Sequence, residues 1–170
     1  QYILARKEDG TVWGAGNNVL GQLGDGEVSD RSTLTKVGGD RRWKKIAAGL
    51  NFAIGTDLEG NHWYWGGDFA SPSQSGAIRS PQPILPPAGD VKVTAVSSGG
   101  TLASMLWFNR VQVLDFARNP TSLDPVPLAL PNVLQPFDLP GTDVWTSVSS
   151  GYNHLLALAL DGSLWAYGDN

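Results

Sequence analysis

Short apolar runs that lead through a glycine-bearing turn into a tryptophan dominate the hydrophobic pattern of this chain. The pattern occurs three times, with residues 3–5 leading into 12–13, residues 52–54 into 63–65, and residues 155–160 into 164–165. Asp-Gly dipeptides permit the positive φ that tight hairpins need, so each copy predicts an antiparallel hairpin. No segment of helical length has a 3.6-residue apolar period. The pattern therefore predicts an all-β protein.

The hairpins recur at a fixed period of about fifty residues. The turn glycines Gly10, Gly60 and Gly162 are 50 and 102 residues apart, one period and then two, and the tryptophans Trp13, Trp63 and Trp165 each follow three residues later. Residues 108–113 keep the strand pattern of the skipped copy but lack its Gly and Trp, which indicates a decayed repeat. A second series of landmark glycines, 50 and 52 residues apart, follows strand-like runs at Gly49, Gly99 and Gly151.

A period of this length, built from short strands, is typical of a β-propeller blade. The repeats run approximately over residues 1–49, 50–99 and 100–151, with a partial copy at 152–170, so about three and a third units are present. A closed propeller normally uses at least about four blades. We therefore expect a single propeller segment, an arc of a larger ring, completed by further blades of the same chain or by other copies.

Two segments carry a family resemblance. Residues 16–26 read Gly-Asn-Asn-Val-Leu-Gly-Gln-Leu-Gly-Asp-Gly, which resembles the G-x-N-x-x-G-Q-L-G-x-G signature of the regulator of chromosome condensation (RCC1-like) repeat family. Residues 154–165 resemble the H-x-x-A-L…D-G-x-V-Y segment of that family, whereas the second and third periods depart from it. The resemblance implies a seven-bladed propeller. Members of this family include guanine-nucleotide exchange factors, ubiquitin-ligase and channel-associated modules, and a secreted bacterial β-lactamase inhibitor.

Composition narrows the function classes. The net charge is −4, which disfavours nucleic acid as a partner. Without cysteine there is no thiol nucleophile or thiolate metal site, and with two histidines we expect neither a metal nor a cofactor. No apolar run approaches the ~20 residues that cross a bilayer. The cysteine-free, Gly/Pro-rich composition suits a secreted or cell-surface bacterial protein.

His154 is the one candidate for catalysis, because Ser149 and Asp161 lie near it in the sequence. The repeat favours a structural role instead: the equivalent positions hold bulky side chains, namely Tyr2, Phe52 and Leu102. His62 likewise occupies a position that the alignment fills with Val12, Gln112 and Leu164. We therefore expect packing roles for both histidines and no enzymatic activity.

Three further clusters each allow two interpretations. Asp25, Glu27 and Asp30 form an acidic connector that suits calcium or, more simply, a solvated turn. Basic residues around Trp43 suggest nucleic acid, yet Trp43 shares its position with Val93 and Trp145, which favours packing; these basic residues are Arg41, Arg42, Lys44 and Lys45. The repeated tryptophans suggest either a carbohydrate-stacking ladder or packing between blades.

Residues that the repeat does not require are the candidates for recognition. They are Leu50, Tyr152, Phe69, Arg79, Trp107, Phe108 and Arg118, which lie beside landmark glycines, in connectors or in the decayed hairpin. We expect Leu50 and Tyr152 to gather on one rim of the propeller. The sequence thus favours a non-enzymatic protein-interaction module or scaffold over an exported carbohydrate-binding or adhesive propeller, with nucleotide exchange less favoured.

Overall fold

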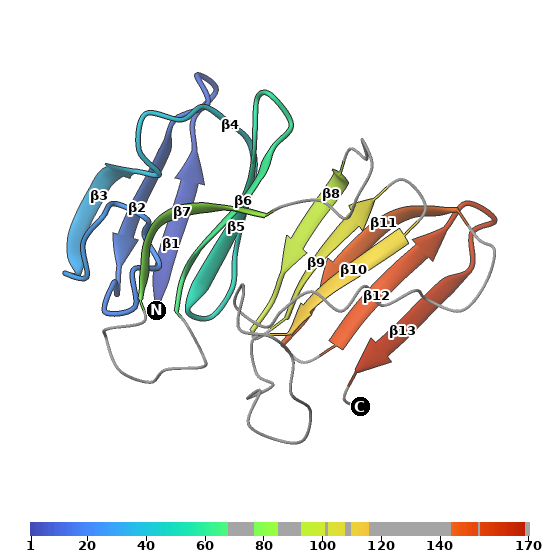
Figure 1. Ribbon diagram of the computed structural model, residues 1–170. Coiled ribbons are helices and arrows are strands. Elements are labelled where there is room, and N and C mark those ends of the chain that lie inside the picture. The colour runs from blue at the N-terminus through green and yellow to red at the C-terminus, as the bar shows by residue number, and fades with distance from the viewer. Residues whose placement is uncertain are drawn as a thin grey trace, which may run out of the picture. The chain divides into compact units, whose positions relative to one another are not determined.

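The computed structural model describes residues 1–67, 77–84, 93–100, 102–107, 110–115, 144–152 and 154–168. These residues form strands and turns only (Figure 1), and with no helix among them there is none that is able to span a membrane. The strands form three sheets of three strands and one of four, all antiparallel. The all-β prediction is confirmed. The chain divides into two compact units, Gln1–Asp90 and Val91–Asn170.

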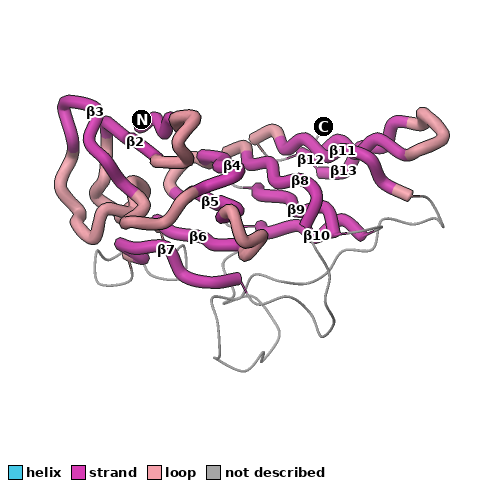
Figure 2. Tube along the Cα trace, turned by 90° about the horizontal axis from the view of Figure 1, so that it is seen from above, coloured by secondary structure: helices cyan, strands magenta, loops and turns pink. Residues whose placement is uncertain are grey.

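The first unit contains two sheets, which Figure 2 shows as magenta strands joined by pink loops. One sheet has the order β1-β2-β3 and the other the order β4-β5-β6-β7, so neighbours in the sequence are neighbours in the sheet. The strands are β1 (Tyr2–Arg6), β2 (Val12–Gly16), β3 (Arg31–Val37), β4 (Trp43–Ala48), β5 (Phe52–Asp57), β6 (His62–Gly66) and β7 (Ile78–Ile84).

The second unit has two three-stranded sheets, ordered β8-β9-β10 and β11-β12-β13. Their strands are β8 (Val93–Ser98), β9 (Leu102–Trp107), β10 (Arg110–Asp115), β11 (Trp145–Ser150), β12 (His154–Ala159) and β13 (Leu164–Gly168). Each of the four sheets is a meander of hairpins, as in the blade of a propeller.

Sheet boundaries do not coincide with the boundaries of the sequence repeat. Strand β4 precedes Gly49 and ends the first repeat, yet it pairs with β5 of the second repeat. β8 and β11 likewise pair with the strand that follows their landmark glycine. Each of these strands has a bulge directly after its first residue. A sheet therefore begins one strand before the glycine that marks the repeat.

The decayed hairpin corrects the sequence alignment by one residue. Val111 pairs with Leu106, in the way that His62 pairs with Thr56, so Val111 rather than Gln112 is equivalent to His62. The cause is a shorter turn: two residues stand between the paired Trp107 and Arg110, against three between Lys7 and Thr11. Val111 is buried, as its place in the repeat requires.

Each unit has its own hydrophobic core. In the first, Trp43 is fully buried and lies 5.2 Å from the Trp65 ring, between centroids, at a tilt of 51°. In the second, Trp145 is buried and meets Trp165 edge-on at 6.1 Å. The expectation that Trp43 packs internally is confirmed. The cores are completed by Val12, Leu23, Val37 and Ala53 in the first unit and by Leu106, Val111, Val148, Leu155, Ala157 and Ala159 in the second.

Glycine is required in the two series of landmark positions for different structural reasons. Gly10, Gly60 and Gly162 adopt φ values of +82°, +92° and +87°, which side chains with a Cβ rarely adopt. Gly49 and Gly151 instead lie under an aromatic ring three residues further on: a Cβ would collide with Phe52 and His154, respectively. The first series permits the hairpin turn. In the second series Gly49 and Gly151 make room for a ring, whereas a Cβ at Gly99 would collide with the Gly151 backbone.

Candidate binding surface

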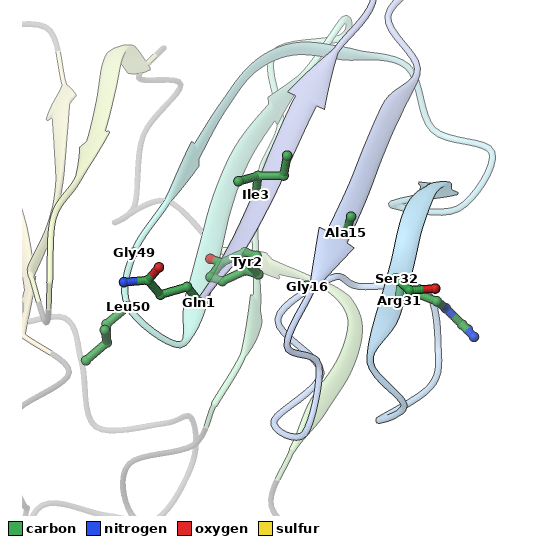
Figure 3. Close-up of a pocket in the computed structure, with 9 residues that line it drawn as sticks. All are labelled: Gln1, Tyr2, Ile3, Ala15, Gly16, Arg31, Ser32, Gly49 and Leu50. Atoms are coloured by element: carbon green, nitrogen blue, oxygen red, sulfur yellow. The ribbon is translucent and has the colours of Figure 1, made fainter.

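Leu50 follows the landmark glycine of the first repeat and borders an open cavity. The side chain is 42% exposed, and the cavity of ≈ 580 Å³ lies beside the start of β1. Figure 3 shows Gln1, Gly49 and Leu50 on one side of this cavity and Arg31 and Ser32 on the other. An exposed leucine beside a hollow is a feature of surfaces that bind apolar groups.

Tyr152 is the corresponding residue of the last repeat, in the second unit. It is 58% exposed, but its ring lies against Gly100, where a Cβ would collide with it. Tyr152 therefore presents one side to solvent and covers the preceding glycine loop of its own unit with the other. Whether Leu50 and Tyr152 share one rim remains a prediction, since each is described within its own unit.

Two of the other predicted binding residues, Arg79 and Trp107, lie within the described structure, and three do not. The Arg79 side chain is exposed, and its backbone oxygen accepts a 2.9 Å hydrogen bond from the Gly26 N–H. Trp107 ends β9, where it pairs with Arg110. Phe69, Phe108 and Arg118 lie outside the described residues.

The loop between β2 and β3 contains a hydrogen-bond network that was not predicted from the sequence. The signature motif of residues 16–26 lies in this loop and could have indicated the network. Asn18 is fully buried. Its Nδ2 donates to Asp25 Oδ1 at 3.0 Å and to the Glu27 backbone oxygen at 3.1 Å, and its Oδ1 accepts from the Leu23 N–H at 2.9 Å. The asparagine of the motif thus fixes the fold of the loop.

The acidic connector belongs to the same network. Arg31 donates to Asp25 Oδ2 at 2.9 Å from Nε and at 2.6 Å from Nη2, while Asp30 accepts the Asn18 N–H at 2.8 Å. Burial alone would raise the pKa of Asp25, but hydrogen bonds from Arg31, the Glu27 N–H and Asn18 outweigh it and hold the pKa below its ordinary value of 3.8. Two of the three carboxylates in this connector therefore have internal partners.

His154 does not form a triad with Asp161 and Ser149. It begins β12, whereas Asp161 lies in the turn beyond the end of that strand, so at about 3.3 Å per residue the two are separated by most of the strand's length. The His154 ring lies against Gly151 but is exposed, unlike the fully buried Phe52 in the equivalent position. The His154 ring thus covers a glycine at the surface and not in the core, and its structural role stays a prediction.

The repeated tryptophans are held by contacts within their own hairpins. The Trp13 and Trp165 indole N–H groups donate at 3.1 Å to the hydroxyls of Thr11 and Ser163, and the Trp63 N–H donates at 2.9 Å to Asp57 Oδ2. The Lys7 Nζ lies 3.9 Å from the Trp13 ring centroid, and the Arg41 guanidinium carbon lies 3.5 Å from that of Trp63. Cations therefore already cover the Trp13 and Trp63 rings, on which a sugar would stack.

The basic cluster around Trp43 is partly engaged as well. Arg41 covers Trp63, and Arg42 Nη1 lies 3.9 Å from Asp9 Oδ2. Trp65, two residues after Trp63, is fully buried and donates to the Gln22 backbone oxygen at 3.0 Å. Among the predicted apolar candidates whose side chains the structure describes, Leu50 and Tyr152 are exposed.

Comparison with known proteins identifies two segments that match a repeat family, and it shows the fold. Residues 9–55 and 145–170 each match the model of the regulator of chromosome condensation (RCC1) repeat. No curated protein matches the chain.

Solved structures with the same fold include human WBSCR16, with 23% identity and a TM-score of 0.76 over 99% of this chain and 46% of that one. Yeast RCC1 (Prp20), solved with Kap60 bound, has 20% identity and a TM-score of 0.73 over 98% and 41%. A second structure of Prp20p from Saccharomyces cerevisiae, whose description includes its binding properties to Gsp1p and histones, has 21% identity and a TM-score of 0.69 over 99% and 42%. The chain spans less than half the length of each of these proteins. Its sheets thus have the fold of an RCC1-like β-propeller, as partial blades that are consistent with an arc of a larger ring, and two of its segments match the RCC1 repeat.

Proposed function

We propose that the chain is a non-enzymatic protein-binding module that recognises its partner through the loops after the landmark glycines. The observation that carries this proposal is the exposure of Leu50 and Tyr152 on loops whose neighbouring hairpin aromatics are engaged in internal contacts. Loops vary without damage to the scaffold that supports them, and exposed apolar and aromatic groups suit a protein partner.

The structural neighbours support the same class of activity. Prp20 is solved with the protein Kap60 bound, and it is described as binding Gsp1p and histones. Those partners belong to Prp20, and only the general capacity to bind a protein is extended to this chain. Nucleotide exchange on a small GTPase is a narrower form of the same proposal, because that activity also requires a protein partner.

Site-specific photo-crosslinking tests the proposal. Benzoylphenylalanine at Leu50 or Tyr152 should form adducts with a protein partner, whereas the same group at Leu58 or Leu160 should not. These control residues are 58% and 71% exposed and lie in the turns at the other end of their hairpins. Against the partner once purified, Leu50→Ala and Tyr152→Ala should each weaken binding by roughly tenfold, as expected for an anchoring side chain. Equal crosslinking at all four positions, or unchanged affinity in both alanine variants at unchanged melting temperature, would contradict it.

A further inference from the structure

Strands β3 and β7 are the outer strands of the two sheets of the first unit, and Figure 1 shows β3 at the end of its sheet. Each pairs with one described neighbour, β3 with β2 and β7 with β6. In an edge strand, the N–H and C=O groups of alternate residues point away from the sheet, where a further strand can pair with them. The two edges differ in whether they present these groups.

The alternation of hydrogen bonds in the first sheet shows which residues of β3 point outward. The Lys7 N–H donates to the Thr11 backbone oxygen at 2.9 Å and closes the hairpin of β1 and β2. Every second pair from there is hydrogen-bonded, which includes Ala5 with Trp13. Trp13 therefore turns its backbone groups toward β1. Its partner in β3, Lys36, points its N–H and C=O away from the sheet.

The second sheet has proline at the same position. Pro83 pairs with Trp63 of β6, so it is equivalent to Lys36. Proline has no N–H and is tolerated in a strand where its nitrogen faces outward, which agrees with the alternation in the first sheet. Two residues earlier, Pro81 stands where β3 has Leu34. β7 thus offers no N–H donor at two positions where β3 offers one.

The outer edge of β3 is also accessible. Leu34 is 52% exposed, and Lys36 is exposed. β7 follows another repeat in the chain, and Gln82 and Pro83 are nevertheless exposed. A preceding repeat therefore leaves this part of an outer strand accessible. The prolines close the edge of β7 to a further strand, whereas the edge of β3 can accept one.

The side chains at this edge indicate the chemistry of the incoming strand. Residues opposite each other in antiparallel strands contact, so an acidic residue suits the position opposite Lys36 and an apolar β-branched residue the position opposite Leu34. The Lys36 Nζ lies 3.0 Å from Asp40 Oδ1, in an exposed pair that another acid can replace at little cost. β3 contains no acidic residue, so a second copy of the chain paired through β3 would offer Lys36 none. A separate acidic segment is therefore the better match.

We propose that the outer edge of β3 binds an extended segment of a partner protein as an added antiparallel strand. The backbone groups of Lys36 and Leu34 form its hydrogen bonds. An acidic residue of the segment lies opposite Lys36, and an apolar β-branched residue, two positions later in the segment, lies opposite Leu34. This edge is separate from the loops after the landmark glycines, so either proposal can fail without the other.

A fluorescein-labelled peptide, Thr-Val-Glu-Thr-Val-Thr, tests the proposal on the whole 170-residue chain. Fluorescence anisotropy should show saturable binding with a Kd below about 1 mM. Methylation of the Glu backbone nitrogen removes an N–H that bonds to β3 and should weaken binding at least about tenfold. Methylation of the next Thr nitrogen, which points away from β3, is the matched control and should change the affinity little. Absence of saturation, or equal effects of the two methyl groups, overturns the proposal.

Substitutions in the chain locate the site. Lys36→Pro removes the outward N–H at a position where Pro83 shows that proline is tolerated, so binding should weaken at least about tenfold at an unchanged urea midpoint. Lys36→Ala keeps the N–H and should weaken binding only about threefold. Conversely, the double variant Pro81→Leu with Pro83→Lys should create a second site for the same peptide on β7.

Two results with these proteins would overturn the proposal. One is peptide binding that survives Lys36→Pro. The other is a concentration-dependent dimer of the native chain, detected by analytical ultracentrifugation, that Lys36→Pro abolishes, because a second copy would then occupy the edge. If Lys36→Pro lowers the urea midpoint, the pair of methylated peptides decides alone.

Discussion

The hairpins β1–β2 and β5–β6 place a tryptophan at the same position but hold it with different residues. In the first, exposed Asp9 accepts the Thr11 N–H at 2.9 Å and its hydroxyl at 2.7 Å, and that hydroxyl accepts the Trp13 N–H. In the second, the nearly fully buried Asp57 performs the roles of both Asp9 and Thr11. It accepts hydrogen bonds from the Asn61 N–H at 2.7 Å, from Asn61 Nδ2 at 3.1 Å and from the Trp63 indole N–H at 2.9 Å.

The residue that places a cation over the tryptophan ring also differs between the two hairpins, as does the residue that supplies the carboxylate. Lys7, which covers Trp13, occupies the position that Asp57 has in the second hairpin. With an acid there, the cation over Trp63 comes from Arg41, which precedes β4. The comparison teaches that the repeat conserves the environment of the ring within this molecule, while the residues that supply it exchange places.

Removing the buried carboxylate should have the largest effect. Asp57→Ala removes a buried acceptor from the half-buried Trp63 indole N–H and from the Asn61 N–H, so we expect a loss of about 3 kcal/mol in the free energy of unfolding. Asp9→Ala, at the exposed turn, should cost clearly less because water replaces the lost partner. Urea denaturation of both variants measures the difference. Equal losses would show that burial does not separate the two turns.

The next largest difference should be in the pH dependence of stability, because β6 has a titratable residue, His62, where β2 has Val12. Burial lowers the pKa of His62 from its ordinary value of 6.5 to about 4, although the nearby Asp57 raises it. The unfolded chain then binds a proton near pH 6.5 that the folded chain binds only near pH 4. The free energy of unfolding should therefore fall as the pH drops through this window, by roughly 2 to 3 kcal/mol, and level off below it.

Urea midpoints at pH 7, 5.5 and 4.5 test this, with His62→Val as the control because Val12 occupies the equivalent position. The variant should lose the slope within the window. The carboxylates Asp25 and Asp57, whose pKa values lie below 3.8, should lose their contribution only at lower pH. A slope that persists in His62→Val would assign the window to another group.

The smallest difference between the two hairpins should be in the cost of replacing their turn glycines, Gly10 and Gly60. Gly60→Ala places a Cβ in open space, so its cost is that of a positive φ alone, about 1 kcal/mol. Gly10→Ala has the same φ penalty, but its Cβ would also lie 3.3 Å from the Arg42 Cβ. We therefore expect Gly10→Ala to be slightly more destabilising, as measured by calorimetry. The reverse order would indicate that the Arg42 segment yields more easily than its Asp9 contact suggests.

The sequence predicted the features that depend on local spacing. Hairpins around Gly10, Gly60 and Gly162 follow from Asp-Gly or Glu-Gly turns between apolar runs. Pairing of β4 with β5 was not predicted, because Gly49 marks the repeat in the sequence while hydrogen bonds between strands decide the sheet. The equivalence of Val111 to His62 was missed because the shorter turn shifts the register without changing the apolar pattern.

The candidate site was predictable to a lesser extent. Position beside a landmark glycine correctly selected Leu50 and Tyr152 as exposed residues, but their binding role stays a prediction. Nothing in the sequence identifies Asp57 as the acceptor for Trp63, since the equivalent positions hold Lys7 and Ala159. Roles of this kind depend on burial and on partners from other strands, which a local pattern does not contain.

The bulge after the first residue of β4, β8 and β11 has a consequence for the evolution of the molecule. Because it recurs at the same place in three sheets, a segment of one period that is duplicated or deleted between any two equivalent points carries a complete set of pairing instructions with it. Unequal recombination between repeats then yields a chain with more or fewer blades and an intact ladder in each.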